Sequence, residues 1–350
     1  MPMTEQRLNG IGKQALALVI GIFGGIVAWQ VGLPLPWMLG PMIAVTIAAM
    51  AHAPVMAPIR LRPAVMPVIG VMLGSAVSAD LLGMLGAWVT TLLLLPVFLA
   101  CAAAWSYLIY RRIGGYDKTT AYFAAMPGGL NDILFIAAEV GGDERRIALA
   151  HAARILIVIS FVALFFGLVL GVRSSGANAA WTGLGSLALT DYAVLGLCAV
   201  LGTWVGRIAR LPAAPIFGPM VLSGIAHVAG WVTLPPPTLF VIAGQIVIGT
   251  IVGTRFAGAT VTEVRRDLLL ALPASGGMLI VATGFAEVIA QTSGIPLSQA
   301  FLAYSPGGLT EMSLLSLALD QDVAYVSVFH VIRITVVIGT APLVYRLLRR

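Results

Sequence analysis

Long runs of apolar residues, separated by short polar segments, make up most of the chain. A run of about 20 apolar residues can cross the hydrocarbon core of a membrane as a helix, and a shorter one can cross where the bilayer is thinned. The pattern therefore predicts an all-α polytopic membrane protein with about ten transmembrane helices. The expected spans are 14–32, 36–52, 64–80, 86–109 and 147–171 in the first half, and 190–206, 214–231, 238–254, 267–290 and 323–345 in the second.

The two halves are copies of one unit. The sequence Pro-Gly-Gly-Leu at 127–130 returns at 306–309, and the same offset relates two His-x-x-Arg sequences. The chain holds only 4 histidines, so apolar composition does not explain this match. Self-similarity at a fixed offset indicates internal duplication. We expect a first membrane repeat over 14–171, a second over 190–346 and a linker at 172–189 on the outer side.

Two further apolar pieces, 121–139 and 298–319, contain the Pro-Gly-Gly sequences and either cross the membrane or re-enter it from one side. Cytoplasmic loops are enriched in Lys and Arg, and this rule decides between the two topologies. If both pieces re-enter, Arg173 alone falls in an outer loop, whereas crossing pieces would move Arg145 and Arg146 outward. We therefore expect five spans and a re-entrant or broken helix in each repeat. An odd number of spans inverts the second repeat relative to the first.

Small residues recur at the spacing that lets helices approach closely. Gly-x-x-x-Gly occurs at 21–25, 70–74, 167–171, 202–206 and 249–253. In a chain with this many spans we expect these glycines to serve internal packing, and a homodimer stays open. Gln245 stands opposite Gly70 in our alignment of the halves, which suggests that the two repeats contribute differently to any site.

Composition excludes several classes of protein. Hydrophobic residues make up 59% of the chain and charged residues 10%, so a water-soluble globule is ruled out and too few charges remain for a nucleic-acid-binding face. The 2 cysteines lie in apolar stretches and predict neither a disulfide framework nor a thiolate metal site. Walker loops, zinc-ligand spacings and nucleophile elbows are not found, so we expect neither an enzyme nor a bound cofactor.

The interrupted helices are the expected site. A proline followed by two glycines ends a helix and frees backbone polar groups, which are tolerated at membrane depth only beside protein or a water-filled cavity. The half-helices that follow, 130–138 and 309–319, would present positive N-termini to an anionic group. An ordinary turn is the alternative. The candidate substrate-binding residues are Gly128, Gly129, Asn131, Asp132, Gly307, Gly308, Thr310, Glu311 and Gln245; Asn131, Thr310 and Gln245 could equally serve as hydrogen-bonding contacts between helices.

Two arginines lie inside the predicted spans. Arg154 and Arg333 are each roughly 10 to 15 Å deep at a rise of about 1.5 Å per residue, too far to reach the membrane surface. A guanidinium at that depth needs a partner, and Asp132 and Glu311 directly follow the breaks. Each arginine either binds the substrate or forms a structural ion pair with one of these acids.

A histidine precedes each buried arginine by three residues, on the same helix face. His151 and His330 could carry a coupling proton, as Asp132 and Glu311 could bind H⁺ or Na⁺, or each histidine could simply hydrogen-bond a buried neighbour.

The duplicated Gly-Pro-Met at 40–42 and 218–220, the paired Pro-Gly-Gly-Leu and the His-x-x-Arg of both copies resemble the bacterial AbrB-type membrane proteins. The resemblance covers nearly the whole chain. It implies an internally duplicated integral membrane protein of the bacterial inner membrane, for which we expect both termini in the cytoplasm. Members of that family carry inherited labels as ammonia monooxygenases or as regulators. A copper enzyme would need clustered histidines, and the four histidines here lie on separate segments.

The sequence thus favours a secondary transporter of a small organic anion, held between the two half-helix ends by Arg154 and Arg333. Two other classes stay open: a non-transporting membrane sensor or regulator of gene expression, and a subunit of a membrane oxidoreductase. The expected partners are the lipid bilayer, the anionic substrate and a coupling ion, and nucleic acid is not among them.

Overall fold

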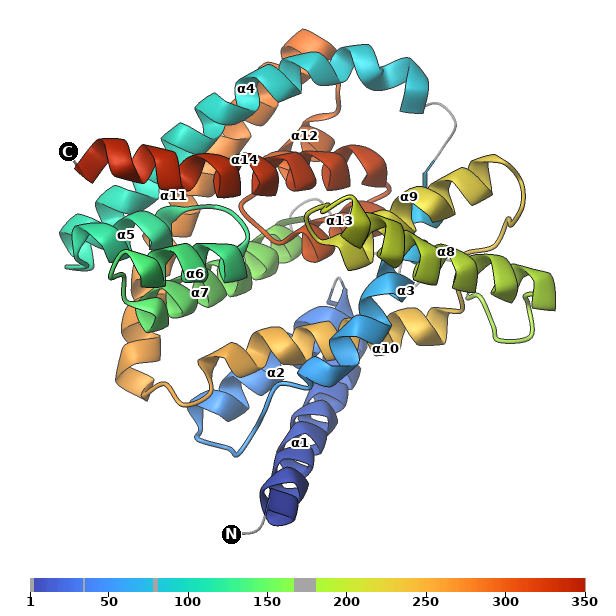
Figure 1. The fold of residues 1–350 in the computed structure, drawn as a ribbon, viewed down its shortest axis with the longest axis horizontal. Coiled ribbons are helices and arrows are strands. Elements are labelled where there is room, and N and C mark those ends of the chain that lie inside the picture. Colours follow the sequence, from blue (N-terminus) through green and yellow to red (C-terminus); the bar gives the residue numbers. More distant parts are fainter. Residues whose placement is uncertain (1–2, 34, 78–80, 167–180, 350) are drawn as a thin grey trace. The chain divides into compact units, whose positions relative to one another are not determined.

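The computed structural model describes residues 3–33, 35–77, 81–166 and 181–349. Within these ranges the chain is helical (Figure 1), and every predicted span coincides with a helix. The first half contains α1 (Met3–Gln30), α2 (Pro36–Met50), α3 (Arg62–Ser75), α4 (Leu81–Leu108), α5 (Lys118–Ala125), α6 (Leu130–Glu139) and α7 (Glu144–Leu164). The second contains α8 (Leu189–Ile208), α9 (Ala214–Val228), α10 (Thr238–Gly253), α11 (Val261–Ser293), α12 (Leu297–Tyr304), α13 (Leu309–Ala318) and α14 (Val323–Arg349).

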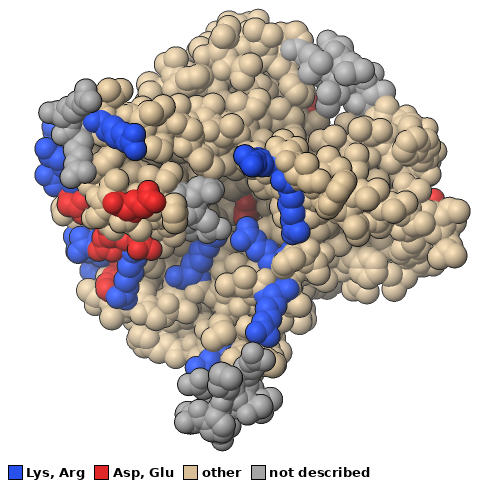
Figure 2. Space-filling view, viewed as in Figure 1, with Lys and Arg blue, Asp and Glu red and all other residues tan. Residues whose placement is uncertain are grey.

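The lengths and surfaces of these helices suit a membrane. Seven of the described helices are long and apolar enough to cross one, and α2, α9 and α13 are shorter apolar helices. Large apolar side chains are exposed on α1 and α8, among them Phe23 at 67% and Val200 at 68%. Most of the face in Figure 2 is uncharged, and its acidic side chains gather over the region where Figure 1 shows α5 to α7. Exposed apolar area on this scale marks a lipid-facing surface, so the chain is a membrane protein.

The chain folds into two units, and each takes segments from both halves of the sequence. The first unit comprises Met1–Ser78, Ser160–Val264 and Leu317–Asp320, and the second comprises Ala79–Ile159, Arg265–Ser316 and Gln321–Arg350. The first unit therefore contains α1 to α3 with α8 to α10. The second contains α4 to α6, most of α7, and nearly all of α11 to α14. The expected division into two successive repeats stays a prediction, and part of its linker, 172–180, lies outside the described residues.

Glycines allow close helix contacts in the first unit. Gly70 on α3 faces α9, where a Cβ atom on this glycine would lie 2.3 Å from the carbonyl oxygen of Ile216. Gly249 on α10 faces α2 in the same way, with 2.3 Å to the carbonyl oxygen of Met38. These glycines thus serve internal packing, as expected from their spacing. The sequence 167–171 lies outside the described residues.

The same contacts correct our alignment of the halves. Gly70 is equivalent to Gly249, because each packs on the matching helix of the other half, and Gln245 is therefore not the counterpart of Gly70. The duplication is also visible in the backbone before α2 and α9. Leu35 and Ala213 both adopt the left-handed conformation, with φ of 48° and 50°.

In the second unit, α4 and α14 pack against the short helices. The phenol of Tyr304 on α12 donates to the carbonyl of Thr91 on α4 at 2.5 Å. The hydroxyl of Thr91 in turn lies 2.8 Å from the phenol oxygen of Tyr325 on α14. Tyr122 on α5 donates to the carbonyl of Ala341 on α14 at 2.8 Å. The helix α14 also packs against α12, so this one long helix contacts short helices from both halves.

Candidate functional site

Two helical hairpins in the second unit contain the Pro-Gly-Gly sequences. In the first, α5 has 8 residues and α6 has 10, which at a rise of about 1.5 Å per residue makes arms of roughly 12 and 15 Å. The second hairpin, α12 and α13, has arms of 8 and 10 residues. Short helices follow both breaks as predicted, and they are α6 and α13.

Polar contacts close each hairpin at its open end. The backbone N–H of Asp143, between α6 and α7, donates to the hydroxyl of Thr120 at the start of α5, at 2.9 Å. In the second hairpin the hydroxyl of Ser298 on α12 donates to Oε1 of Gln321, just after α13, at 2.7 Å. In both copies the chain enters and leaves the hairpin at the same end.

The two buried arginines bind the backbone at the breaks. Arg333 on α14 is 2% exposed and donates from Nη1 to the carbonyl of Ser305 and from Nη2 to that of Gly307, each at 2.5 Å. Arg154 on α7 is 5% exposed and donates from Nη1 to the carbonyl of Ala124 at 3.4 Å. In each copy a guanidinium thus reaches carbonyls at the C-terminal end of the first half-helix or in the break, where a positive charge is favoured.

Each guanidinium group has a buried donor that no described residue satisfies. The Nε atoms of Arg154 and Arg333 have no hydrogen-bond partner among the described residues. The two groups also lie close enough to act on one another electrostatically, and like charges repel. The arrangement brings one arginine from each half into a single buried, positively charged region.

Glu311 occupies the N-terminus that follows the second break. Its side chain is 8% exposed, and a Cβ atom on Gly308 would lie 2.0 Å from its Oε2. Glu311 is the third residue of α13, so its carboxylate folds back over the start of its own helix. The protein's own acid therefore occupies the positive helix end at which we expected a substrate anion. Thr310 beside it is 6% exposed.

Both histidines bond to their own helices. Nδ1 of His151 lies 3.0 Å from the carbonyl of Ile147, and Nδ1 of His330 lies 2.9 Å from the carbonyl of Val326. The exposed fraction is 1% for His151 and 0% for His330.

The other predicted residues divide into three groups. Gly128 lies against α14, since a Cβ atom there would be 3.0 Å from Cβ of Val337. Gly129 precedes α6 as its N-cap residue, and Gly307 contributes the carbonyl bound by Arg333. The side chains of Asn131 and Asp132 lie outside the described part of the chain. Gln245 is 8% exposed and belongs to the first unit, whereas the rest of the set belongs to the second.

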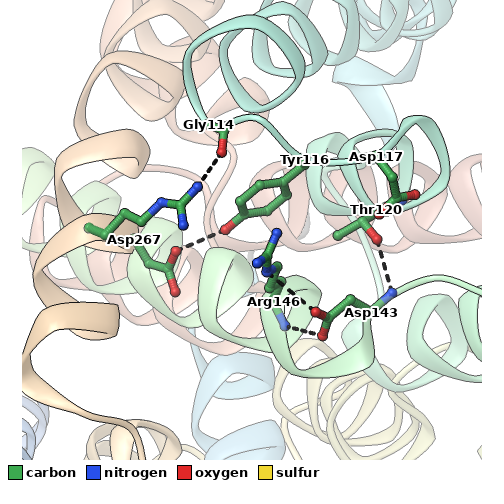
Figure 3. Close-up of polar contacts among 8 residues, drawn as sticks. Gly114, Tyr116, Asp117, Thr120, Asp143, Arg146 and Asp267 are labelled. Atoms are coloured by element: carbon green, nitrogen blue, oxygen red, sulfur yellow. Dashed lines mark hydrogen bonds and ion pairs between the residues drawn. The ribbon is translucent and has the colours of Figure 1, made fainter.

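A second polar cluster lies at the chain segments around α5, α7 and α11 (Figure 3). The phenol of Tyr116 donates to Oδ1 of Asp267 at 2.9 Å, and Arg266 donates to the carbonyl of Gly114 at 2.5 Å. The guanidinium of Arg146 lies 5.3 Å from the ring centre of Tyr116, within cation–π range. Burial raises the pKa of the Tyr116 phenol, and the neighbouring carboxylate of Asp267 raises this pKa further, so the phenol stays protonated as a donor.

Comparison with known proteins identifies the family. A family model described as "Transition state regulatory protein AbrB" matches residues 37–349. The chain belongs to the AbrB family.

Two relatives extend over almost the same length. A Bacillus subtilis (strain 168) protein described as "Uncharacterized protein YhjN" is 27% identical over 361 residues, with 96% of this chain and 93% of the relative covered. An Escherichia coli (strain K12) protein described as "Putative regulator AbrB" is 25% identical over 317 residues, with 90% of each covered. The predicted membership of the AbrB-type membrane family is thus confirmed.

Sequence reasoning missed part of the polar core of this AbrB-family chain. Asp267 is 5% exposed, and the residue 179 positions earlier is Trp88, so the duplication gave no signal for the acid. Ser313 and Ser327, whose hydroxyl oxygens lie 2.7 Å apart, are likewise buried polar residues of the second copy. Their counterparts at the same offset are Leu134 and Ala148, and this contrast in polarity between the copies is the signal that could have found them.

Proposed function

We propose that this AbrB-family chain is a secondary transporter of a small organic anion, which binds by alternating access beside two mirrored broken helices. The observation that carries the proposal is the pair of buried guanidinium groups, one from each copy, which repel one another and whose Nε donors have no partner in the described part of the chain. Intramembrane charges of this kind mark substrate and ion pathways in membrane proteins.

Backbone carbonyls do not neutralise these charges. An arginine has five N–H donors, and Arg333 donates two hydrogen bonds to carbonyl dipoles, whereas Arg154 donates one long bond. Two positive charges in a low-dielectric interior are costly, and a carboxylate or phosphate group could accept hydrogen bonds from both guanidinium groups. The carbonyl groups in these bonds carry no net charge, so a bound anion would add the charge balance that these bonds do not supply.

The hairpins support a re-entrant topology. Arms of roughly 12 and 15 Å reach about half-way through a hydrocarbon core of about 30 Å. The contacts of Thr120 with Asp143 and of Ser298 with Gln321 favour hairpins that enter and leave on one side. In an inverted repeat the two hairpins would enter from opposite sides and meet near the midplane, as discontinuous helices do in secondary transporters.

Attachment of the arginines to the breaks links binding to movement. An anion that draws Arg154 away from the carbonyl of Ala124 would free the end of α5 to shift. Glu311, folded over the start of α13, would act as a gate or as the group that binds a coupling H⁺ or Na⁺. The proposal thus assigns the arginines both roles that the sequence left open, substrate binding and support of the hairpin.

Transport in proteoliposomes tests the proposal. A thermal-shift screen of carboxylates, phosphonates and amino acids on the detergent-purified protein first identifies a ligand, because a ligand that binds only the folded state stabilises it. Counterflow of that ligand is then compared for wild type, Arg154→Ala and the control Arg207→Ala, whose side chain is exposed on α8. Loss of flux in Arg154→Ala alone supports the site, and full transport by Arg154→Ala contradicts it.

The topology is tested separately by cysteine labelling. Arg145 and Arg265 are both exposed, so each can be replaced by cysteine in a variant that lacks Cys101 and Cys198. We expect a membrane-impermeant maleimide to reach both new cysteines from the cytoplasmic side. Labelling from opposite sides would rule out the inverted, re-entrant topology and with it the transporter mechanism.

A second candidate function is a non-transporting membrane regulator, favoured by the descriptions of the matching family model and of the Escherichia coli relative. The same arginines would then form a sensor pocket for the anion. Ligand binding without flux, together with a partner protein that co-purifies in stoichiometric amounts, would support this function over transport.

A further inference from the structure

His330 lies three residues before Arg333 on α14, and the two side chains interact electrostatically. A carbonyl oxygen only accepts hydrogen bonds, so the contact of Nδ1 with the carbonyl of Val326 at 2.9 Å requires a proton on Nδ1. The tautomer is therefore fixed by the helix itself. Whether the second ring nitrogen, Nε2, also carries a proton depends on the charge of the imidazole.

The surroundings of His330 favour a neutral ring. The side chain is fully buried, and the guanidinium of Arg333, one turn along α14, acts on it electrostatically. A second positive charge in that position would face both desolvation and repulsion. With the proton on Nδ1, a neutral ring presents a bare lone pair at Nε2, and this atom has no hydrogen-bond partner among the described residues.

The buried region thus offers both kinds of hydrogen-bonding group. Nε of Arg333 and Nε of Arg154 are unsatisfied donors, and Nε2 of His330 is an unsatisfied acceptor. Buried polar groups in native proteins normally find partners, so these unmatched groups indicate which hydrogen-bonding groups a ligand would supply. Donors alone would suit any anion. The added acceptor suits a ligand that also supplies a hydrogen-bond donor.

We propose that the site is selective for an oxyanion that also carries an O–H group, and that Nε2 of His330 accepts the hydrogen bond from this group. The inference rests on the proposed anion site and names its ligand class. Two kinds of compound share this chemistry: a protonated oxyanion, such as hydrogen phosphate or a phosphonate, and a hydroxycarboxylate. An oxyanion without a proton would turn an oxygen lone pair toward that of Nε2, and the two would repel.

Matched anion pairs measure this selectivity. Titration calorimetry on the detergent-purified protein compares inorganic phosphate, which keeps a proton at neutral pH, with sulfate, which does not, and malate with succinate, which lacks the hydroxyl. A hydrogen bond in a charged, buried site corresponds to about 10- to 100-fold in affinity. We expect a preference of that size for phosphate over sulfate if the ligand is a protonated oxyanion, or for malate over succinate if it is a hydroxycarboxylate.

Variants at His330 connect the preference to the acceptor. His330→Phe removes the lone pair and should abolish the preference while leaving weak binding of both members of a pair. His330→Gln retains an acceptor oxygen and should keep part of it. His227→Phe is the matched control, because its ring lies in the first unit and both ring nitrogens have carbonyl partners, Ser223 and Leu234. This control should bind as wild type does.

The outcomes separate the two proposals. Equal binding within both pairs, or a preference that survives His330→Phe, overturns the role of His330 and leaves the anion site standing. Failure of all four anions to bind the folded wild-type protein at millimolar concentration overturns both. The comparison of phosphate with sulfate needs no variant, so a fold defect in His330→Phe leaves the inference open to refutation.

Discussion

One close contact holds the first hairpin against α14, and it can be tested by a pair of substitutions. A Cβ atom on Gly128 would lie 3.0 Å from both Cβ and Cγ1 of Val337 and 3.4 Å from Cγ2. Carbon atoms pack most favourably at about 3.5 to 4.0 Å. Gly128→Ala should therefore push the break away from α14, because the branched side chain of Val337 is 3% exposed and has little room to move.

The magnitude follows from packing. Overfilling a packed site typically costs about 1 to 3 kcal/mol, and we expect Gly128→Ala in that range. Val337→Ala removes two methyl groups at about 0.8 kcal/mol each and leaves a small cavity, for a loss of about 2 kcal/mol. In the double variant the new methyl group fills the vacated space. Its destabilisation should fall below the sum of the single values by about 1 kcal/mol or more.

Reversible unfolding in mixed micelles measures these free energies. The matched control is Gly276→Ala on α11, where a Cβ atom would meet nothing within 4 Å. Replacing a glycine in an open helix interior should stabilise the protein by about 0.5 to 1 kcal/mol. If Gly128→Ala is as harmless as the control, or if the two losses simply add, the hairpin does not pack on α14 as described.

Three further substitutions test other contacts. Tyr116→Phe removes the hydrogen bond to Asp267 and should destabilise the protein by about 1.5 to 3 kcal/mol in the same unfolding assay, with no effect if that bond does not form. Asp117→Ala removes the N-cap of α5, at a cost of about 1 kcal/mol. Burial raises the pKa of Asp117, but hydrogen bonds from Thr120 and nearby backbone amides outweigh it and lower the pKa overall, so the cap should stabilise at neutral pH and weaken as the pH falls through the lowered pKa. Gly249→Ala would place a methyl group 2.3 Å from a backbone carbonyl and should reduce the yield of folded protein far more than Gly276→Ala does.

The positions of the helices were predictable because a membrane span is recognisable in the sequence. A span needs a run of apolar residues, and a Pro-Gly-Gly sequence ends a helix whatever surrounds it, so both the spans and the starts of α6 and α13 follow from local chemistry. The assembly of the two units was not predictable in this way. Contacts such as that of Gly70 with Ile216 join different halves of the chain, and hydropathy contains no information on which span faces which.

The misplaced counterpart of Gly70 has a physical cause. Residues four apart lie on one face of a helix, so a shift of one turn leaves the apolar pattern almost unchanged. Gln245, Gly249 and Gly253 lie on such a face of α10, and periodicity alone does not distinguish the correct register from one displaced by a turn. The structure distinguishes them because only the pairing of Gly70 with Gly249 gives equivalent backbone approaches in both halves.

Sequence reasoning located the buried arginines but not what they bind. Intramembrane charge predicts a partner, and the acids next to the breaks were the obvious side chains. For Arg333 the observed acceptors are carbonyl groups of Ser305 and Gly307, freed by the break itself. The sequence does not show which backbone carbonyls will accept hydrogen bonds, since every residue has one. The break and the arginine are therefore parts of one structure, in which the glycines expose the carbonyls and the guanidinium satisfies them.

The two copies of this arrangement differ in a way that matters for function. Arg333 donates two bonds of 2.5 Å, whereas Arg154 donates one of 3.4 Å, near the limit of a hydrogen bond. A ligand anion competes more easily with one long bond than with two short ones. In the proposed anion site, Arg154 is therefore the group that can exchange its carbonyl for the anion, while Arg333 uses Nη1 and Nη2 to hold the second hairpin. On this argument an alanine at Arg154 removes binding from a folded protein, and an alanine at Arg333 damages the fold before binding can be measured.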